Sequence, residues 1–393
     1  MAVPSGAAVP RIAILTNVLP SYRQGFYDRL FAREDVVTTV YCQSAIAGIN
    51  VRSIHARYPG RVRLVKGIAA KGEVIGWQFT PWRAVLFDYD VVFVDGNPRS
   101  LSRALSATVR RLLRRPVVLW TSGHSYGANA IAERIRLLWT RMFDRLLVYT
   151  DADVRYLRER GFKSQDIIAM NNGLDQVQID AAIASWDRPR LDDWRRQQNL
   201  SERTVLLSCA RLDPKNRFEQ MVAAMPEILR QVPDALWCVI GSGAEEERLA
   251  SKVREAGLAD RVRFVGELYE ESDLAPWFLS AVVFVHPAAI GLSILHAFGY
   301  GLPVVTHATA EHHGPEFAAF TEGLSGRTYR ENDVADLAGT VVSLVRDEAT
   351  RSAMARHVRH IVQCEHNVDV MVERFVTAVG NSLQDRTPIG ARV

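Results

Sequence analysis

The residues best placed for chemistry are three cations that follow a predicted buried strand. The strand TVLLSCAR (204–211) ends at Arg211, and Lys215 and Arg217 follow in the next turn. Guanidinium and ammonium groups gathered at one strand end suit the neutralisation of phosphate oxygens. A solvated turn of the same composition is the structural alternative. We expect a diphosphate site here that needs no metal ion.

A second feature suited to an anion lies in residues 281–305. Residues 281–286 form a predicted buried strand that stops at Pro287, because proline cannot donate to a β-ladder. A short loop follows at 288–291, and a helix begins with Ser293 in its first turn. The start of a helix presents free N–H groups to an anion. The sequence therefore predicts that this loop and the three cations converge on one phosphate.

Length and composition indicate a globular protein that uses no disulfides. A chain of 393 residues is long enough for two domains, and 48% apolar with 23% charged residues is typical of soluble proteins. No apolar run reaches the length of a membrane-spanning helix, and the first residues resemble a frayed start rather than a signal peptide. Four cysteines without CxxC spacing favour a reducing cytoplasm and no zinc.

Charge is divided unevenly along the chain. Residues 1–175 hold 25 Lys and Arg against 14 Asp and Glu, whereas residues 176–393 hold 23 against 30. The basic first half indicates an anionic partner. Nucleic acid, an acidic membrane face and a diphosphate substrate all fit, and an arginine-rich solvated surface is the structural alternative.

The first half of the sequence alternates between predicted strands and helices. Strands are expected at 11–16, 36–42, 91–96, 116–120, 145–150 and 166–170, with helices at 26–33, 101–113, 130–143 and 151–160. This alternation predicts a parallel sheet whose functional loops share its carboxyl edge. Segment 44–82 has no clean period and holds at most one expected strand, near 62–65.

The expected helix 101–113 is amphipathic and basic. One face carries Arg103, Arg110 and Arg114, and the other carries Leu101, Leu105, Val109 and Leu112. We expect the leucine face to pack on the sheet and the arginines to lie in water. A basic amphipathic helix resting on a membrane surface is the alternative.

A second strand–helix series fills the rest of the chain. Strands are expected at 204–211, 235–241, 262–266 and 281–286 and from residue 303, with closing helices at 334–346, 349–363 and 368–384. We expect residues 1–175 to form a first domain, 176–367 to form a second, and the helix 368–384 to cross back onto the first. Two such domains would face each other across a cleft between their carboxyl edges.

A family resemblance emerges from the second half. The succession CARLDPKNRFEQMVAA, VIGSGAEEERL, VRFVGEL, HPAAIGLSILHAFGYGLPVVTH, GPEF and GLSG resembles the donor domain of the retaining family 4 glycosyltransferases, and NNGLD (171–175) resembles that family's Asn-Gly-x-Asp signature. Together these motifs cover nearly all of 165–340. The resemblance implies the GT-B fold, an α/β architecture of two Rossmann-like, doubly wound domains facing across a cleft.

The resemblance also implies roles for individual residues of the second domain. Arg211 falls on the family's diphosphate-binding arginine, and Asn216 falls on its partner lysine, so Lys215 or Arg217 must substitute. The main chain that holds the sugar diphosphate would come from Ala289, Ile290, Gly291, Leu292 and Ser293. The main chain that holds the nucleobase would come from Val265, Gly266, Glu267 and Leu268. Glu316 falls on the glutamate after the next strand.

Two positions depart from the family pattern. The family's paired glutamates, of which the first contacts the donor sugar and the second the ribose, fall on Ala288 and His296. Ala288 cannot make the sugar contact, whereas His296 can hydrogen-bond a ribose. The sequence therefore resembles a variant branch of the family, and a packing role for His296 under the loop is the alternative.

The first domain offers fewer candidates. By the resemblance, we expect His124 beside the donor sugar, although a lone histidine after a strand is more often structural or merely exposed. The loop containing Ser21, Tyr22, Arg23 and Gly25 takes the place of the family's glycine-rich loop near the phosphates and the acceptor. The triplets Asp88-Tyr-Asp90 and Asp151-Ala-Asp153 are not expected to bind metal, because one precedes a strand and the other opens a helix.

The resemblance implies a metal-independent, retaining hexosyltransferase without a cofactor. His124, Arg211 and Lys215 are its expected catalytic residues. A nucleoside diphosphate sugar is the donor, and a lipid-linked, polysaccharide or small-molecule acceptor is held mainly by the first domain. We expect a cytoplasmic protein in peripheral contact with the inner membrane face and no nucleic-acid partner. A non-catalytic sugar-nucleotide-binding protein and a GT-B sugar-nucleotide epimerase are the alternatives, the epimerase being disfavoured by Ala288.

Overall fold

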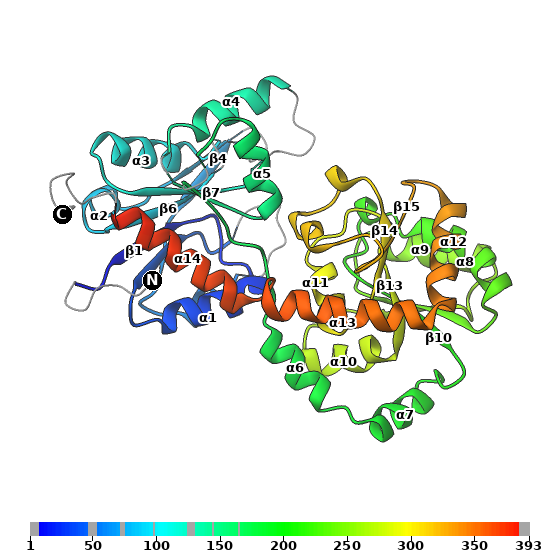
Figure 1. Ribbon diagram of the computed structural model, residues 1–393. Helices are drawn as coiled ribbons and strands as arrows, with labels where there is room; N and C mark the ends of the chain where they lie inside the picture. The colour runs from blue at the N-terminus through cyan, green and yellow to red at the C-terminus, as the bar shows by residue number, and fades with distance from the viewer. Residues whose placement is uncertain are drawn as a thin grey trace. The chain divides into compact units, whose positions relative to one another are not determined.

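The protein consists of two compact units. The computed structural model describes residues 8–45, 53–70, 75–96, 99–123, 130–143, 145–163 and 166–384 (Figure 1). One unit comprises Met1–Asn172 with Val368–Val393, and the other comprises Gly173–Asn367. The chain thus changes unit next to the boundary expected after residue 175, and its last helix belongs to the first unit.

The first unit is built on a parallel sheet of seven strands. Their order is β3-β2-β1-β6-β7-β8-β9. The strands are β1 (Arg11–Leu15), β2 (Val37–Cys42), β3 (Val62–Leu64), β6 (Val91–Asp95), β7 (Val117–Thr121), β8 (Arg145–Val148) and β9 (Ile167–Ala169). The central strands β6 and β7 are almost wholly buried, as expected of a parallel sheet covered on both faces.

Helices cover both faces of this sheet (Figure 1). One layer contains α2 (Trp82–Phe87), α3 (Leu101–Leu112), α4 (Ala130–Thr140) and α5 (Asp151–Glu159), and the other contains α1 (Gln24–Ala32) and α14 (Val368–Gln384). Phe375 of α14 stacks on Phe93 of β6 with ring centroids 4.1 Å apart. The end of the chain is therefore part of the first unit's core.

Helix α3 buries the face that was expected to lie in water and exposes the face that was expected to pack on the sheet. Arg103 and Arg110 are buried, whereas Leu101, Leu105 and Leu112 are 49%, 46% and 77% exposed. The guanidinium of Arg110 donates to the main-chain carbonyl oxygens of Val85, Leu86, Tyr89, Asp90 and Pro116 at 2.7–3.3 Å. A planar fork of five N–H donors suits such a cluster of acceptors, and leucine offers none. The expectation that the leucine face packs on the sheet is wrong.

The segment without a clean period contains structure that the sequence did not reveal. Strands β4 (Gly67–Ala70) and β5 (Ile75–Gln78) form an antiparallel pair outside the main sheet, and α2 follows at once. The main chain of Gln78 donates to Ser102 of α3 at 2.8 Å. Neither strand alternates polar and apolar residues strictly, so periodicity alone could not identify them.

The second unit is built on a parallel sheet of six strands. Their order is β12-β11-β10-β13-β14-β15. The strands are β10 (Thr204–Cys209), β11 (Ala235–Ile240), β12 (Val262–Gly266), β13 (Ala281–Val285), β14 (Val304–His307) and β15 (Gly326–Tyr329). The chain builds outward from β10 to β12, then returns to β13 beside β10 and builds outward the other way. The change of direction falls between β10 and β13.

Two helical layers enclose this second sheet. One contains α8 (Glu219–Gln231), α9 (Glu246–Glu255) and α12 (Val334–Arg346). The other contains α6 (Gln176–Ala184), α7 (Arg188–Gln197), α10 (Glu271–Ser280), α11 (Ser293–Gly299) and α13 (Glu348–Cys364). Trp194 of α7 packs edge-on against Trp277 of α10, with ring centroids 4.9 Å apart. The polar segment that contains α6 and α7 therefore packs on the second unit.

The longest helices bury only one side. Each of α13 and α14 has 17 residues, and charged side chains interrupt the apolar positions of both. Their buried residues, such as Val358 and Phe375, belong to the cores of their units. Within the part of the chain that the structure describes, no helix combines the length and the hydropathy needed to cross a bilayer.

Candidate functional site

The predicted anion-binding features meet at the switch point of the second sheet. Strands β10 and β13 are parallel neighbours, and the chain winds away from them in opposite directions. Open α/β sheets bind ligands outside the carboxyl ends of the strands at such a point. Arg211 follows β10 and the loop 286–292 follows β13. The structure thus brings both features to one edge of one unit.

Two glycines fix the main chain around Arg211. Gly241 has a φ of +133°, and a Cβ there would lie 2.1 Å from the carbonyl oxygen of Ala210. A Cβ on Gly243 would lie 2.5 Å from the carbonyl oxygen of Leu212. The loops after β10 and β11 therefore touch, and only glycine permits this approach. Arg211 projects from that support with its side chain 64% exposed, 3.6 Å from Asp213.

The three predicted cations have different surroundings. Lys215 lies exposed in the 3₁₀ turn Pro214–Asn216, and across the described residues it has no ion-pair partner. Arg217 is bound by Glu331 and Asn332, to whose side-chain oxygens its Nη1 donates at 3.0 and 2.8 Å. Arg211 and Lys215 therefore remain available to an anion, whereas the charge of Arg217 is already compensated.

Asn216 supports the loop instead of facing solvent. Its side chain is buried, and Nδ2 donates to the carbonyl oxygen of Arg211 at 2.7 Å. That hydrogen bond fixes the main chain from which the arginine extends. Asn216 therefore positions Arg211 in this structure, a role that spacing in the sequence could not reveal.

Free N–H groups line the loop after β13. Among the described residues, the main-chain N–H groups of Gly291, Leu292 and Ser293 find no acceptor. The neighbouring Ile290 is pinned, because its N–H donates to Nδ1 of His313 at 3.2 Å and its carbonyl oxygen accepts from Gly314 at 2.7 Å. Successive free N–H groups on a fixed loop form a concave site for an anion.

A buried carboxylate lies against the same loop. A Cβ on Gly314 would lie 2.9 Å from Oε2 of Glu316, and a Cβ on Gly291 would lie 3.6 Å from it. Glu316 belongs to the 3₁₀ turn Pro315–Ala319 and is buried. Ala288, the position without its expected glutamate, is only 2% exposed. The loop therefore has a carboxylate beside it although Ala288 supplies none.

Three buried histidines hold the loops after β13 and β14. The rings of His307 and His313 stack with centroids 3.9 Å apart, and Nε2 of His313 donates to the carbonyl oxygen of His307 at 2.9 Å. Burial lowers the pKa of His286 to about 3 and that of His307 to about 4, so both stay neutral near pH 7. Their spacing in the sequence does not single them out, although His286 and His307 end the strand sequences VFVH and VVTH.

His296 is partnered by a carboxylate that lies 25 residues earlier in the chain and that the sequence pattern does not reveal. Its Nε2 lies 3.1 Å from Oε2 of Glu271, which accepts from the hydroxyl of Tyr300 at 2.6 Å. The ring of Phe278 packs on the imidazole with centroids 4.6 Å apart. Burial raises the pKa of the Glu271 carboxyl, but its interaction with His296 and the hydrogen bond from Tyr300 outweigh burial, so this pKa lies below its ordinary value.

The loop after β12 is tied to the loop after β11. Gly266 has a φ of +88°, and its carbonyl oxygen accepts from the N–H of Gly241 at 2.8 Å. Glu267 accepts from the hydroxyls of Ser242 and Tyr269, and these hydrogen bonds lower the pKa of its carboxyl. Val265 and Leu268 are half-buried beside it. The predicted nucleobase segment thus lies at the same carboxyl edge, two strands from Arg211.

In the first unit, the predicted acceptor loop is the 3₁₀ turn Ser21–Arg23 that precedes α1. The Arg23 guanidinium lies over the rings of Trp120 and Tyr149, 4.9 and 5.8 Å from their centroids. Tyr22 is exposed, and Gly25 is buried at the start of α1. Arg23 is therefore held by aromatic rings. The predicted site residue His124 lies outside the described residues.

A further polar cluster lies at the switch point of the first sheet. Arg103 donates to Oδ1 of Asn17 at 2.7 Å and to Ser100, and it lies 3.7 Å from Asp95. Asn17 and Asp95 follow or end β1 and β6, the neighbours at which the strand order reverses. The sequence placed Arg103 in water, so this cluster was missed.

The two aspartate triplets serve the main chain. Asp153 forms a capping box with Thr150 at the start of α5 and accepts from the N–H of Gly123 at 2.8 Å. Asp90 accepts from the N–H of Arg11 at 2.9 Å. Asp153 thus lies at the start of a helix, as the sequence indicated for its triplet.

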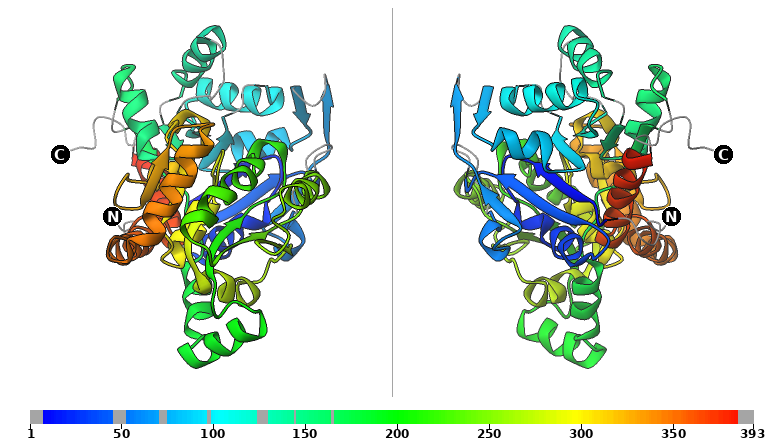
Figure 2. Two further views of the ribbon diagram at one scale, coloured as in Figure 1. Left: turned by 90° about the vertical axis from the view of Figure 1, so that its right-hand side faces the viewer. Right: turned by 90° about the vertical axis from the view of Figure 1, so that its left-hand side faces the viewer.

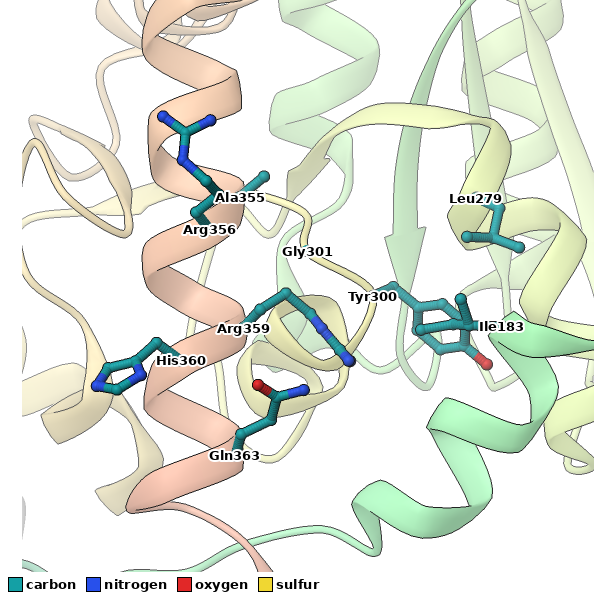
Figure 3. Close-up of a pocket in the computed structure, with 9 residues that line it drawn as sticks. All are labelled: Ile183, Leu279, Tyr300, Gly301, Ala355, Arg356, Arg359, His360 and Gln363. Atoms are coloured by element: carbon teal, nitrogen blue, oxygen red, sulfur yellow. The ribbon is translucent and has the colours of Figure 1, made fainter. Parts of the chain in front are cut away.

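A groove on the second unit lies away from the predicted residues. It has a volume of about 490 Å³ and lies between α13 and the turn at Gly301 (Figure 3). Leu279 and Gly301, which line it, precede β13 and β14, so it opens at the amino edge of the sheet. Its Arg359 is paired with Asp180 at 2.7 Å. The groove is therefore separate from the switch-point site.

Comparison with known sequences relates the second unit to a family of enzymes. Residues 191–360 match the family model of the glycosyl transferases group 1. A Corynebacterium glutamicum GDP-mannose-dependent monoacylated alpha-(1-6)-phosphatidylinositol monomannoside mannosyltransferase is 27% identical over 192 residues, 46% of this chain and 48% of that protein. The Mycolicibacterium smegmatis GDP-mannose-dependent alpha-(1-6)-phosphatidylinositol monomannoside mannosyltransferase is 27% identical over 274 residues, 65% and 68% of the two chains. The match thus spans about half the length of the first relative.

Comparison with solved structures identifies the fold. Anabaena Alr3699/HepE in complex with UDP superposes with a TM-score of 0.69 at 14% identity, over 94% of this chain and 99% of that one. A glycosyltransferase from Rickettsia africae gives 0.71 at 12% identity, over 96% and 100%. At these identities the likeness concerns the fold alone. The predicted GT-B class, an α/β protein with two Rossmann-like domains, is confirmed.

Proposed function

We propose that this chain is a retaining, metal-independent hexosyltransferase of family 4 that uses a nucleoside diphosphate sugar. The observation that carries the proposal is the meeting of Arg211, Lys215 and three free N–H groups at the switch point of the second sheet. The matched group 1 region, 191–360, contains all of them. Two cations and a fixed N–H concavity suit a diphosphate.

The chemistry of the proposed reaction places the largest demand on the leaving group. The bond from the sugar's anomeric carbon to the phosphate oxygen breaks, and a bond from the acceptor oxygen to that carbon forms on the same face. The acceptor's proton passes to the departing phosphate oxygen. Arg211, Lys215 and the N–H groups of 291–293 would stabilise the charge that develops on the diphosphate. His124 is the further catalytic contact that the family resemblance implies.

The donor's other parts would bind along the same edge. We assign the sugar to the carboxylate of Glu316, which lies against the main chain of Gly291 while Ala288 offers only a methyl group. The ribose would reach the linked pair His296 and Glu271, since a carboxylate and an imidazole can both bond hydroxyl groups. Main chain of 265–268 would hold the nucleobase.

For the acceptor, we propose a lipid-linked, polysaccharide or small-molecule substrate held by the first unit. Two relatives are named for phosphatidylinositol mannosides, and residues 1–175 carry the excess of positive charge. A cytoplasmic protein in peripheral contact with the inner membrane face, with no nucleic-acid partner and no cofactor, fits such a substrate.

A turnover assay tests the proposal. Purified protein is incubated with UDP-, GDP-, ADP- and TDP-sugars with and without candidate acceptors, and release of the nucleoside diphosphate is measured with and without EDTA. We expect release that needs the acceptor and persists in EDTA. Arg211→Ala should weaken this release. Arg230→Ala, which removes an exposed arginine of α8, is its matched control.

A non-catalytic sugar-nucleotide-binding protein is the second candidate, and one observation favours it. The buried methyl of Ala288 removes a carboxylate from the place where the family resemblance expects contact with the sugar. The same assay separates the two functions. Saturable nucleotide binding without turnover on every donor and acceptor would support binding alone and contradict the transferase.

A further inference from the structure

The first unit exposes two aliphatic stripes on neighbouring helices. On α4 and the turn after it, Ile131, Ile135, Leu138 and Met142 are 72%, 58%, 63% and 38% exposed. Their spacing, i, i+4, i+7 and i+11, places them on one side of a helix. On α3, Leu101, Leu105 and Leu112 share one side, and Leu113 lies at its end. We call these eight side chains the α3–α4 face.

Both stripes face away from the same sheet. Helices α3 and α4 lie in one layer of the first unit in Figures 1 and 2, following β6 and β7 in turn. The inner sides of the two helices contribute Ala107, Leu137 and Trp139 to one core cluster. The α3–α4 face is therefore the outer surface of that layer. Exposed aliphatic side chains in such number mark an interaction site.

Helix α3 cannot turn its leucines inward. The five carbonyl contacts of Arg110 and the contacts of Arg103 with Asn17 and Ser100 lock its polar side against the sheet. Rotation of the helix would strand a buried guanidinium, which is far more costly than an exposed leucine. The outward direction of the leucine stripe is thus built into the fold.

The charge around the face indicates its occupant. Residues 99–143 contain nine arginines, of which Arg103 and Arg110 are buried against the sheet, and one acidic residue, Glu133, whose carboxylate is paired with Arg136. Arg114 and Arg134 are exposed beside the stripes, whereas Arg141, although exposed, donates to the carbonyl oxygen of Arg160 at 2.7 Å. Two copies joined through this face would oppose arginine to arginine, because a two-fold contact pairs a patch with itself. An anionic lipid surface suits both the aliphatic side chains and the charge.

We propose that the α3–α4 face docks this protein on an anionic membrane, with the leucines and isoleucines entering the interface and the arginines contacting lipid phosphates. The inference deepens the membrane contact of the proposed function and rests on it for its biological meaning. It names the surface and the lipid chemistry that make the contact. The experiment that tests it measures lipid binding alone and does not depend on sugar transfer.

Vesicle flotation of the full chain tests the proposal. Vesicles of phosphatidylcholine with phosphatidylglycerol should bind the protein, vesicles of phosphatidylcholine alone should bind it weakly, and added salt should weaken the binding. Ile135→Ser with Leu138→Ser should lower the partition coefficient by about tenfold. Arg134→Glu, which changes the charge by two units, should lower it by about thirtyfold. All three side chains are exposed, so the thermal midpoint should not move.

Matched variants on the second unit serve as controls. Val177→Ser removes an equally exposed aliphatic group of α6, and Arg254→Glu reverses an exposed charge of α9. Both should bind vesicles like the parent. Equal binding by the parent and the α3–α4 variants would overturn the proposal. So would a dimer in sedimentation equilibrium that the variants dissociate, without vesicle binding by the parent.

The membrane proposal and the transferase proposal fail separately. Nucleotide affinity, measured by calorimetry without lipid, should be the same in the α3–α4 variants and the parent. Loss of vesicle binding with unchanged nucleotide affinity supports the assignment of the face. A parent that binds nucleotide but no anionic vesicle would overturn the membrane proposal alone.

Discussion

The two units use their helices differently around similar sheets. In the second unit, α11 buries Leu295 and Phe298, and its start supplies free N–H groups at the carboxyl edge. In the first unit, α3 buries arginines and turns its leucines outward. One pattern follows from burial of apolar area, and the other follows from the needs of buried carbonyl groups. Departures from the pattern in which apolar side chains face the core thus indicate surfaces that have a function other than stabilising the fold.

The largest effect should come from the inner side of α3. Arg110→Met leaves the carbonyl oxygens of α2 and the following turn without their donor, so we expect a loss of about 4 kcal/mol in the free energy of unfolding. Chemical denaturation monitored by tryptophan fluorescence measures it. Leu112→Gln, on the outer side of the same helix, should stay within about 0.5 kcal/mol. Similar losses of unfolding free energy in both variants would contradict the stated difference between the inner and outer sides of α3.

The next largest effect should come from the glycine support of Arg211. Gly241→Ala forces a methyl group against the carbonyl of Ala210 at a φ of +133°, so we expect a loss of about 3 kcal/mol together with weaker nucleotide binding. Gly257→Ala is the control. Its φ is +68° but nothing lies near, so only the strain of about 1 kcal/mol should be lost. Denaturation of both proteins provides the measurement.

The histidines of the second unit should make it sensitive to acid. The pKa of His307 is about 4 in the folded chain against 6.5 as its ordinary value, so between these values the unfolded chain binds more protons. Stability must then fall as the pH falls, by about 2 kcal/mol from pH 7 to 5 for this one residue. The measurement is the free energy of unfolding at each pH. His307→Gln should reduce that dependence by the share of this residue, and an unchanged dependence in this variant would contradict the prediction.

A smaller effect should separate sugar contact from nucleotide contact. Glu316→Gln keeps the shape of the side chain but removes its charge, so we expect transfer to slow by about tenfold while nucleoside diphosphate affinity stays within about twofold. Steady-state kinetics and calorimetry supply the two readouts. Glu311→Gln, on the exposed neighbouring turn, is the control. An equal loss in both readouts would show that Glu316 merely supports the loop.

Much of the fold could be predicted because its signals are local. Buried strands such as β6 contain unbroken apolar runs (VVFV at 91–94), and the last helices begin and end within one residue of their expected limits. The hairpin β4–β5 has no such signal. The direction of α3 also escaped prediction, because it depends on carbonyl groups of α2 that Arg110 reaches only in the folded chain.

In the candidate site too, local features could be predicted from the sequence, whereas contacts between distant residues could not. The position of Arg211 at a strand end follows from the sequence, since the strand and its loop are contiguous. The pairing of Arg217 with Glu331 and of His296 with Glu271 joins residues distant in the sequence, so spacing could not reveal either. Nor could it reveal that Asn216 holds the carbonyl of Arg211.

The most direct measurement is the calorimetric affinity of Arg211→Ala for the nucleoside diphosphate that binds the parent protein. Loss of a charge-assisted hydrogen bond to phosphate should weaken that affinity by about tenfold or more. Arg230→Ala should bind like the parent. An Arg211→Ala protein that is folded and binds the nucleotide with the parent's affinity would contradict the account.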